Sequence, residues 1–184
     1  YTEEAAARCM EEIFVPTMRA MNAEGRTFEG CLYFGLMLTA KGPKVIEYNC
    51  RFGDPEAQAI LPRLETDFME IIDACIDGQL DQVDIKWKDC CSCVVVMASG
   101  GYPLSYAKGY EITGIKECGH PVFQAGTKIN DEGKLVTSGG RVLCVYGEGK
   151  TSDEAIDSAY EGVSKISFKD MHFRHDIGRT LGNK

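Results

Sequence analysis

Hydrophobic side chains recur at intervals of three and four residues near the start of the chain. Over residues 3 to 21 this spacing predicts an amphipathic helix. Thr2 is a suitable N-cap, and Glu3 and Glu4 complement the partial positive charge of the first turn. Pro16 lacks the N–H group that an internal helical position donates, so we expect it to kink this helix or split it in two.

Two strands joined by a turn are expected next. From residue 28 to residue 39 the chain is apolar on both faces of an extended pattern, which is typical of a central strand. Lys41-Gly42-Pro43 predicts a turn, and residues 45 to 49 predict a second strand. Strands separated by so few residues should pair as an antiparallel hairpin.

Two helices and a change of character follow. Asp54 and Pro55 suit the N-cap and the first position of a short helix that ends near Pro62. A second helix, with one apolar face, is predicted for residues 66 to 78. Residues 78 to 88 are polar and lack a regular period, so they form the candidate boundary between two units.

Short strands separated by glycine-rich turns fill most of the remaining chain. We expect strands at residues 91–99, 122–125, 135–137 and 141–146. Thr151 to Glu154 form a capping box that begins a final helix. The pattern predicts an α+β protein of two small units, at residues 1–85 and 89–184.

The composition is that of an ordinary globular protein. Of the 184 residues, 44% are hydrophobic and 26% are charged, which excludes an intrinsically disordered chain. No stretch approaches the roughly 18 apolar residues of a membrane span, so we expect no membrane partner. The net charge of −8 weighs against nucleic acid as a partner.

Nine cysteines are scattered through the sequence, mostly within apolar runs. An odd number of thiols in a chain of this size favours buried, reduced cysteines in a cytoplasmic protein over a disulfide scaffold. Cys90, Cys91 and Cys93, followed by Cys118 and His120, suggest zinc more than the other cysteines do. Because no second CxxC follows, core thiols are the favoured interpretation.

Glu47 and Asn49 are the first polar pair that suggests a binding site. Residues i and i+2 of a strand project from the same face, so these two side chains can converge on one hard cation, which prefers oxygen ligands. The alternative is that both simply face solvent while Ile46 and Tyr48 face the core. Spacing alone favours that alternative, because alternation is the commonest strand pattern.

The connection after this strand is rich in charged groups. Arg51, Asp54 and Glu56 lie between the strand and the expected helix, whose start favours anions. Arg51 can hold a carboxylate or a phosphate through two parallel hydrogen bonds. In the simpler interpretation, Asp54 only caps the helix and Glu56 only complements its dipole.

A second candidate anion site lies in the later glycine-rich turns. Gly139-Gly140-Arg141 lets backbone amides approach an anion closely, with Arg141 as the counter-charge. Lys128, after Gly126-Thr127, would lie nearby if the two strands pair. In the alternative interpretation both cations are ordinary surface residues.

The twelve residues from Glu47 to Gln58 resemble the signature of the phosphoribosylamine–glycine ligases, a family of ATP-grasp ligases. Further matches, in the order of that family, lie at residues 30–37, 95–103, 126–128, 139–143 and 174–178. The resemblance covers essentially the whole chain. Leu104, Ser105 and His175 depart from the residues usual in the family, and we interpret these changes as peripheral.

The resemblance implies a fold and a reaction. Residues 1–85 would be the C-terminal portion of an ATP-grasp fold, an antiparallel sheet with helices, and residues 89–184 a small α+β C-terminal domain with a strongly bent sheet. In this family the carboxylate of glycine attacks the γ-phosphate of ATP to give glycyl phosphate. The amine of 5-phosphoribosylamine then attacks the acyl phosphate and forms glycinamide ribonucleotide.

The resemblance also implies roles for particular residues. Glu47 and Asn49 would be ligands of Mg²⁺ or Mn²⁺, which neutralises the phosphates of the substrate ATP. Catalytic and substrate-binding roles would fall to Arg51 and Asp54, which would orient glycine, the acyl phosphate or the phosphoribosyl group. The family's 5′-phosphate contacts would fall to the cations of the glycine-rich turns, Arg141 and Lys128.

Part of the family's active site has no counterpart in the sequence. The chain begins at Tyr1, and it contains no glycine-rich phosphate loop with a following lysine. We therefore expect the N-terminal half of the enzyme to be missing and the isolated chain to be inactive. The alternative is a stand-alone, non-catalytic module that binds a metal and a ribonucleotide.

Overall fold

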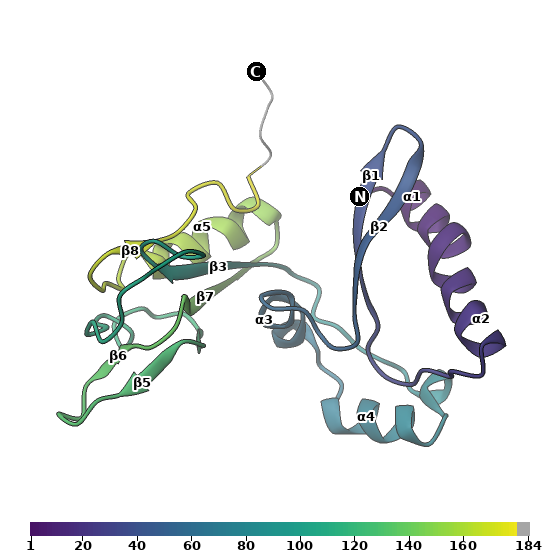
Figure 1. Ribbon diagram of the computed structural model, residues 1–184, viewed down its shortest axis with the longest axis horizontal. Coiled ribbons are helices and arrows are strands. Elements are labelled where there is room, and N and C mark those ends of the chain that lie inside the picture. Colours follow the sequence, from purple (N-terminus) through teal and green to yellow (C-terminus); the bar gives the residue numbers. More distant parts are fainter. Residues whose placement is uncertain (180–184) are drawn as a thin grey trace. The chain divides into compact units, whose positions relative to one another are not determined.

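The computed structural model describes residues 1–179, and this part of the chain contains both helices and sheets, as expected for an α+β protein (Figure 1). It divides into two compact units. The first unit holds residues 1–54 and 66–86, and the second holds residues 55–65 and the chain from Trp87 onward. The expected domain boundary between residues 85 and 89 stays a prediction.

The first unit begins with a helical segment that changes its hydrogen-bonding pattern once. It consists of α1 (Glu3–Cys9), a π-helical turn η1 (Met10–Phe14) and α2 (Val15–Ala23). The predicted cap is confirmed, because Thr2 Oγ1 accepts a hydrogen bond of 3.2 Å from the backbone N–H of Ala5.

The π-helical turn explains how the helix passes Pro16. The backbone N–H of Val15 donates to the carbonyl of Met10, five residues back, instead of to the residue four back. A proline has no N–H, and its ring would clash with the carbonyl four residues earlier in a regular α-helix. The wider turn just before Pro16 thus splits the predicted helix without ending it.

A hairpin packs against this helical segment. Strands β1 (Tyr33–Thr39) and β2 (Gly42–Asn49) are antiparallel, as predicted, although β1 begins later than the expected residue 28. Phe34 of β1 lies 4.5 Å from Phe14 and 5.2 Å from Tyr48, measured between ring centroids. This face of the hairpin is therefore the one that contacts the helices.

The hairpin contains a β-bulge that changes its register. Gly35 pairs with Glu47, but the next residue, Leu36, pairs with Val45. Ile46 thus has no partner of its own across the hairpin. Bulges of this kind bend a strand and re-aim the side chains that follow.

The rest of the first unit is a helical excursion. Helix α4 (Phe68–Ile76) is capped by Asp67, whose Oδ1 accepts a hydrogen bond of 2.8 Å from Met69 N–H, and the short η3 (Leu80–Gln82) follows. The two ends of the excursion are held together, because Lys86 N–H donates to Thr66 Oγ1 at 2.7 Å.

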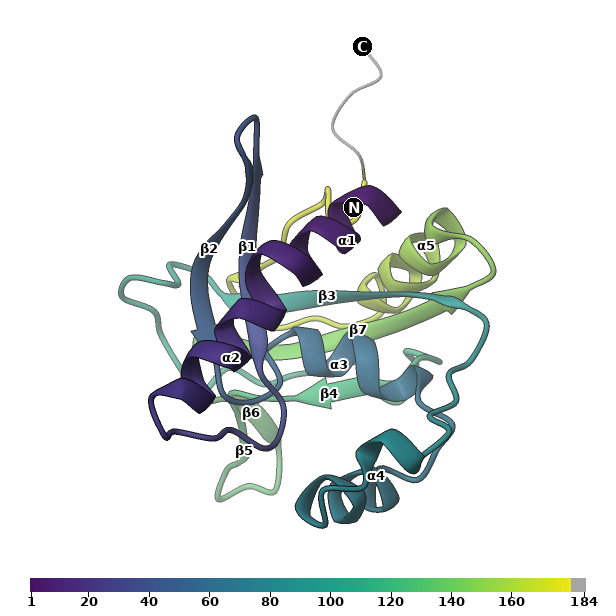
Figure 2. The ribbon, with the colours of Figure 1, turned by 90° about the vertical axis from the view of Figure 1, so that its right-hand side faces the viewer.

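The second unit is built on an antiparallel sheet with the strand order β4-β7-β3-β8 (β8 is labelled in Figure 1, the other three strands in Figure 2). Its long central strands, β3 and β7, pair along eight positions. Helix α5 packs against both of them. The elements of this unit are α3 (Glu56–Ile60), η2 (Leu61–Arg63), β3 (Cys91–Ser99), β4 (Val122–Gln124), β5 (Thr127–Ile129), β6 (Leu135–Thr137), β7 (Arg141–Gly149), α5 (Ser152–Val163) and β8 (Met171–His172).

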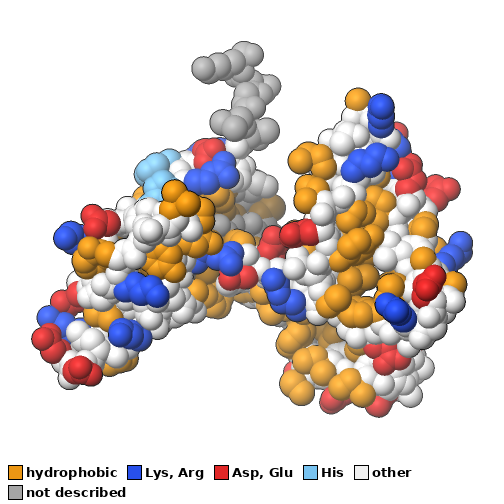
Figure 3. Space-filling model, viewed as in Figure 1, with side chains coloured by type: hydrophobic (Ala, Val, Ile, Leu, Met, Phe, Trp, Pro, Cys, Tyr) orange, Lys and Arg blue, Asp and Glu red, His pale blue; other side chains and the backbone are white. Residues whose placement is uncertain are grey.

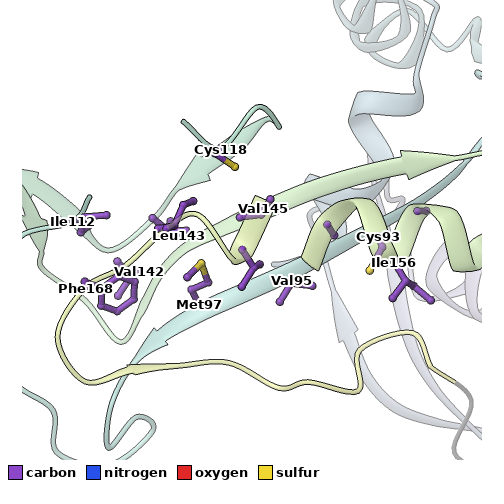
Figure 4. Packing of buried hydrophobic residues seen from close by; sticks show 14 residues of the cluster. Cys93, Val95, Met97, Ile112, Cys118, Val142, Leu143, Val145, Ile156 and Phe168 are labelled. Carbon is purple, nitrogen blue, oxygen red and sulfur yellow. The ribbon is translucent and has the colours of Figure 1, made fainter. Parts of the chain in front are cut away.

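The main core lies between α5 and the sheet. Val95 and Met97 of β3, Val145 of β7 and Ile156 of α5 are almost completely buried there (Figure 4). Burial of such side chains stabilises the folded state by about 1.5–3 kcal/mol each. A smaller cluster on the other sheet face contains residues that alternate with these along the strands, namely Val94, Cys144 and Tyr146.

The expectation of a strongly bent sheet, which the resemblance implied, is wrong. Among the described residues no sheet is strongly curled. Strands β3 and β7 stay paired from Cys91–Gly149 to Ala98–Arg141, with one irregularity between Met97 and Ala98. The edge strands β4 and β8 have three and two residues, which is too short to carry a curl outward.

The N-cap of α3 also differs from the expectation. Helix α3 begins at Glu56, and Pro55 rather than Asp54 occupies the N-cap position, without a side-chain hydrogen bond to the helix. The reason is the backbone of Pro55, whose ψ of 16° keeps it just outside the helix. Within residues 1–179, no helix is long and apolar enough to cross a membrane.

Candidate functional site

Glu47 and Asn49 lie side by side on β2. Asn49 Nδ2 donates a hydrogen bond of 3.2 Å to Glu47 Oε1, so the two side chains share one face of the strand, as i and i+2 residues do. Tyr48, between them, packs on Phe34 on the helix-facing side of the hairpin. The pair therefore projects from the opposite face of the hairpin, where Glu47 is exposed and Asn49 is half-buried.

Across the hairpin, Gly35 is the partner of Glu47. A Cβ atom added to Gly35 would lie 2.7 Å from Glu47 Cγ, which is closer than such atoms pack. The side chain of Glu47 thus lies over the backbone of Gly35, in space that any other residue type would fill. Sequence reasoning missed Gly35, whose role becomes visible only when the strand register is known.

The donor set of this pair fits a hard divalent cation. Glu47 supplies carboxylate oxygens, and Asn49 uses its NH₂ group toward Glu47, which leaves its carbonyl oxygen suited to a cation. Mg²⁺ is commonly held by one or two protein ligands while waters and substrate phosphates complete its shell. Two oxygen-donating side chains on one strand face match that requirement.

Arg51 and Asp54 follow β2 closely within the same unit. Both side chains are exposed, and Arg51 Nη1 donates a hydrogen bond of 2.7 Å to the carbonyl of Phe52. A guanidinium carries five N–H donors, so this contact leaves several for a ligand. Glu56 falls in the second unit, in a helix of only five residues.

The glycine-rich stretches of the second unit converge. Gly126 N–H donates to the carbonyl of Arg141 at 2.9 Å, and Gly139 N–H donates to the carbonyl of Gly126 at 3.1 Å. A Cβ on Gly126 would lie 2.5 Å from the Cα atom of Gly139, so the two backbones touch. Only glycine permits so close an approach.

The Ser99 to Tyr102 stretch joins the same cluster. Ser99 N–H and Oγ each donate a hydrogen bond of 2.8 Å, to the carbonyls of Gly140 and Gly139 respectively. The ring of Tyr102 lies where a side chain on Gly140 would be. Three stretches that are far apart in the sequence thus meet around the start of β7.

The two cations of this region lie on different strands. Arg141 is exposed at the start of β7, and Lys128 is exposed in β5. The condition set for their proximity, that the two strands pair, is not met: β5 pairs with β6, with Lys128 opposite Val136, whereas β7 pairs with β3 and β4. Gly126, two residues before Lys128, connects this strand to the cluster.

The cysteine group does not form a metal centre. Among residues 1–179, no three or more His, Cys, Asp or Glu side chains gather as a metal site would require. All nine cysteines are free thiols, and Cys93 and Cys118 belong to the hydrophobic core. Burial raises the pKa of the Cys93 thiol, and Arg179 partly opposes that shift, so Cys93 is a core thiol, as expected.

Sequence reasoning also missed a polar group in the second unit. The phenol of Tyr146 donates a hydrogen bond of 2.9 Å to Glu148 Oε2, and Lys88 Nζ lies 3.5 Å from the same oxygen. His120 Nδ1 and Ser158 Oγ are 3.3 Å apart, and all five residues line one cavity of about 310 Å³. The Tyr-x-Glu spacing of β7 is the signal that could have indicated the first contact.

Two family models match the chain. The ATP-grasp (A) domain of phosphoribosylglycinamide synthetase matches residues 1–57, and the C domain of the same synthetase matches residues 92–180. Between them they cover most of the sequence, and their order along the chain is the order that the resemblance implied.

Curated relatives agree with these matches. The phosphoribosylamine–glycine ligase of Clostridium acetobutylicum is 46% identical over 179 residues, which are 97% of this chain and 43% of the relative. That of Vibrio vulnificus is 49% identical over 96% of this chain and 42% of its own length. A bifunctional purine biosynthetic protein of Dictyostelium discoideum is 44% identical over 96% of this chain and 23% of its own length.

A solved structure has the same fold. The crystal structure of the phosphoribosylamine–glycine ligase from Thermotoga maritima matches with a TM-score of 0.84 and 36% identity, over 96% of this chain and 44% of that one. The helix-backed hairpin and its oxygen-donor pair thus lie in a protein of the ATP-grasp class. The chain belongs to the phosphoribosylamine–glycine ligase family, and it spans less than half the length of these relatives.

Proposed function

We propose that this chain is part of a ligase that joins glycine to 5-phosphoribosylamine. ATP is hydrolysed to ADP and phosphate, glycyl phosphate is the intermediate, and glycinamide ribonucleotide is the product. The observation that carries the proposal is the Glu47–Asn49 pair, which lies on one strand face within a chain whose relatives bear the name of this ligase.

In this proposal Glu47 and Asn49 hold Mg²⁺ or Mn²⁺. When bound, such a cation neutralises phosphate charge and thereby supplies electrostatic stabilisation of phosphoryl transfer. The protein's part is to keep two oxygen donors fixed on a rigid strand. The hydrogen bond between the two side chains supports this role, since it orients both before a cation arrives.

Arg51 and Asp54 are the proposed catalytic and substrate-binding residues beside this pair. The planar guanidinium of Arg51 suits the carboxylate of glycine or the acyl phosphate, and its contact with the Phe52 carbonyl limits where it can point. Asp54 can accept hydrogen bonds from the amine or hydroxyl groups of a substrate. Both are exposed, as residues that meet a ligand must be before it binds.

Arg141 and Lys128 are the proposed contacts of the 5′-phosphate of phosphoribosylamine. The backbone contacts of Gly126 with Gly139 and of Ser99 with Gly140 hold the start of β7 in place, so Arg141 projects from a fixed position. Lys128 is the weaker candidate of the two, because its strand pairs away from β7. Its long side chain would have to reach back toward the glycine cluster.

The remaining contacts of ATP and glycine come, in this proposal, from the N-terminal half of the same enzyme. Hydrophobic side chains gather on the hairpin, where Met37, Leu38, Ile46 and Tyr48 are each at least half exposed (Figure 3). Apolar groups so exposed are typical of a surface that another part of the protein covers. We place the enzyme in the cytoplasm, where thiols such as these nine stay reduced.

The test compares Glu47→Gln with Glu29→Gln in the intact ligase that contains this chain. Both variants remove one exposed carboxylate, but Glu29 lies in the loop before the hairpin. We expect Glu47→Gln to lower product formation at least 100-fold, by analogy with the loss of one charge-stabilising group, and Glu29→Gln to act like the parent. Glycinamide ribonucleotide formed from ATP, glycine and phosphoribosylamine is the readout.

Two results would contradict the proposal. The first is near-parental turnover of Glu47→Gln at low magnesium. The second is product formation by the 184-residue chain alone, which would mean that it needs no further half. A chain that binds glycinamide ribonucleotide while the intact protein has no ligase activity would instead support the non-catalytic module.

A further inference from the structure

Gly35 has a place in the hairpin that its residue type alone makes possible. It is the cross-strand partner of Glu47, and opposite residues of an antiparallel pair project from the same face. In an ordinary pair the two side chains would stand next to each other, about 5 Å apart at their Cβ atoms. Here Gly35 has no side chain, and the side chain of Glu47 lies over the space that a Cβ atom of residue 35 would fill.

The distances show how closely Glu47 occupies that position. A Cβ on Gly35 would lie 2.7 Å from Glu47 Cγ and 3.6 Å from its Cδ. The nearest atom is in the middle of the side chain, between the Cβ atom and the carboxylate. It therefore cannot move aside without moving the carboxylate that Asn49 contacts at 3.2 Å.

The bulge places this contact. Ile46 is skipped in the pairing immediately beside Gly35, so the backbone of β2 changes direction just before Glu47. From Glu47 onward the alternation is regular, with Tyr48 toward the helices and Asn49 on the Glu47 face. The bulge aims Glu47 and Gly35 provides the room into which it is aimed.

From this geometry we infer that Gly35 is a positioning residue for the Glu47 carboxylate. It acts through Glu47 and does not itself contact a ligand. The inference rests on the proposed function, in which Glu47 and Asn49 hold the divalent cation, and it adds that a methyl group on the opposite strand is enough to spoil that donor pair.

The test measures Mn²⁺ binding, by the electron paramagnetic resonance signal of free Mn²⁺, to the intact ligase in the presence of ADP. We expect Gly35→Ala to raise the Mn²⁺ dissociation constant about 10- to 100-fold, as loss of a supporting residue does at other metal sites. Lys44→Ala, at an exposed position of the same hairpin opposite Met37, is the control and should bind Mn²⁺ like the parent.

A double-mutant cycle keeps the inference testable if Gly35→Ala folds poorly. Glu47→Ala removes the Cγ atom that the new methyl group would meet. In that background Gly35→Ala should lower the unfolding temperature much less than it does in the parent. An equal decrease of the unfolding temperature in both backgrounds would mean that the methyl group contacts something other than Glu47, and it would refute the inference.

Glu47→Gln separates failure of this inference from failure of the proposed function. If Glu47→Gln weakens Mn²⁺ binding but Gly35→Ala leaves it unchanged, the metal site stands and the role of Gly35 is refuted. If neither variant changes Mn²⁺ binding, Glu47 is not a ligand, and both the proposed metal site and the role of Gly35 are refuted. Weaker Mn²⁺ binding by both variants, with Lys44→Ala binding like the parent, supports both proposals.

Discussion

Tyr146 is a buried phenol in the second unit whose hydrogen bond points at a carboxylate. Burial raises its pKa well above the ordinary value, and the bond to Glu148 adds to the shift. The neutral phenol is therefore favoured in the folded state. In the unfolded chain the same group ionises near pH 10.

This shift sets the sign of a pH dependence. Above about pH 10 the unfolded state releases a proton that the folded state keeps. The contribution of Tyr146 to the free energy of unfolding is therefore fully present below that pH and is lost as the pH rises. We expect the free energy of unfolding to fall by up to about 1.4 kcal/mol more per pH unit than in Tyr146→Phe. Urea unfolding of both proteins at pH 9, 10 and 11 measures these free energies. An equal dependence on pH in the parent and in Tyr146→Phe would contradict the prediction.

The sequence predicted individual residues well where their role is local. Thr2 and Thr151 cap their helices, as their positions indicated, because a cap depends mainly on the next few residues. Asp54 is the exception, because Pro55 occupies the N-cap position of α3.

The sequence did not predict the place of Gly35 opposite Glu47, because that depends on strand register. It did not predict the Tyr146–Glu148 contact either, because that depends on burial. The metal and substrate roles stay predictions.

Among the elements, α5 shows how a cap and a core combine. Thr151 Oγ1 accepts a hydrogen bond of 3.2 Å from Glu154 N–H, and Glu154 Oε2 accepts one of 2.8 Å from Lys150 N–H. Both ends of the predicted capping box are thus used, although the glutamate reaches one residue earlier than the usual N-cap. The helix then covers the central strands of the sheet.

Removal of this cap should have a moderate and specific cost. We expect Thr151→Ala to lower the free energy of unfolding by about 1 kcal/mol, since a backbone N–H at the start of α5 loses its partner. Thr151→Ser keeps the hydroxyl group and should recover most of the loss. Urea unfolding followed by circular dichroism compares the three proteins, and equal loss in both variants would show that the methyl group matters instead.

The predicted elements differ from the observed ones mainly where pairing between distant parts of the chain determines the structure. The strands at residues 91–99 and 135–137 were placed correctly, because their apolar patterns are strong. Strand β5 was not predicted, because its three residues give too short a pattern, and the expected strong bend of the sheet is wrong, because sheet curvature is not encoded in a local pattern.

At the scale of the whole molecule, the chain passes between its two units three times, after residues 54, 65 and 86. Residues 55–65 belong to the second unit through several contacts. Ser92 Oγ donates to the carbonyl of Ala59 at 2.8 Å, and Lys88 N–H donates to the carbonyl of Arg63 at 2.8 Å. Ala59 also packs against the smaller cluster of the sheet.

This threading predicts how the second unit can be isolated. A chain from residue 55 onward in which a short glycine-serine linker replaces residues 66–86 should fold, because Leu64 and Trp87, on either side of the replaced segment, form a β-bridge. It should melt at a higher temperature than residues 87–184 alone, which lack α3 and its contacts. The fluorescence of Trp87, the single tryptophan, reports both transitions, and equal melting temperatures would contradict the prediction.

The π-helical turn before Pro16 also limits which lengths the first helix can have. One extra residue in a turn rotates everything after it by about 100° relative to an uninterrupted α-helix. Thr17, whose hydroxyl group lies 3.5 Å from that of Tyr48, depends on this rotation to face the hairpin. One further codon between Met10 and Phe14 would therefore turn α2 away from β2, whereas loss of one codon there would let the turn close to a regular α-helical turn and leave the faces of α2 unchanged.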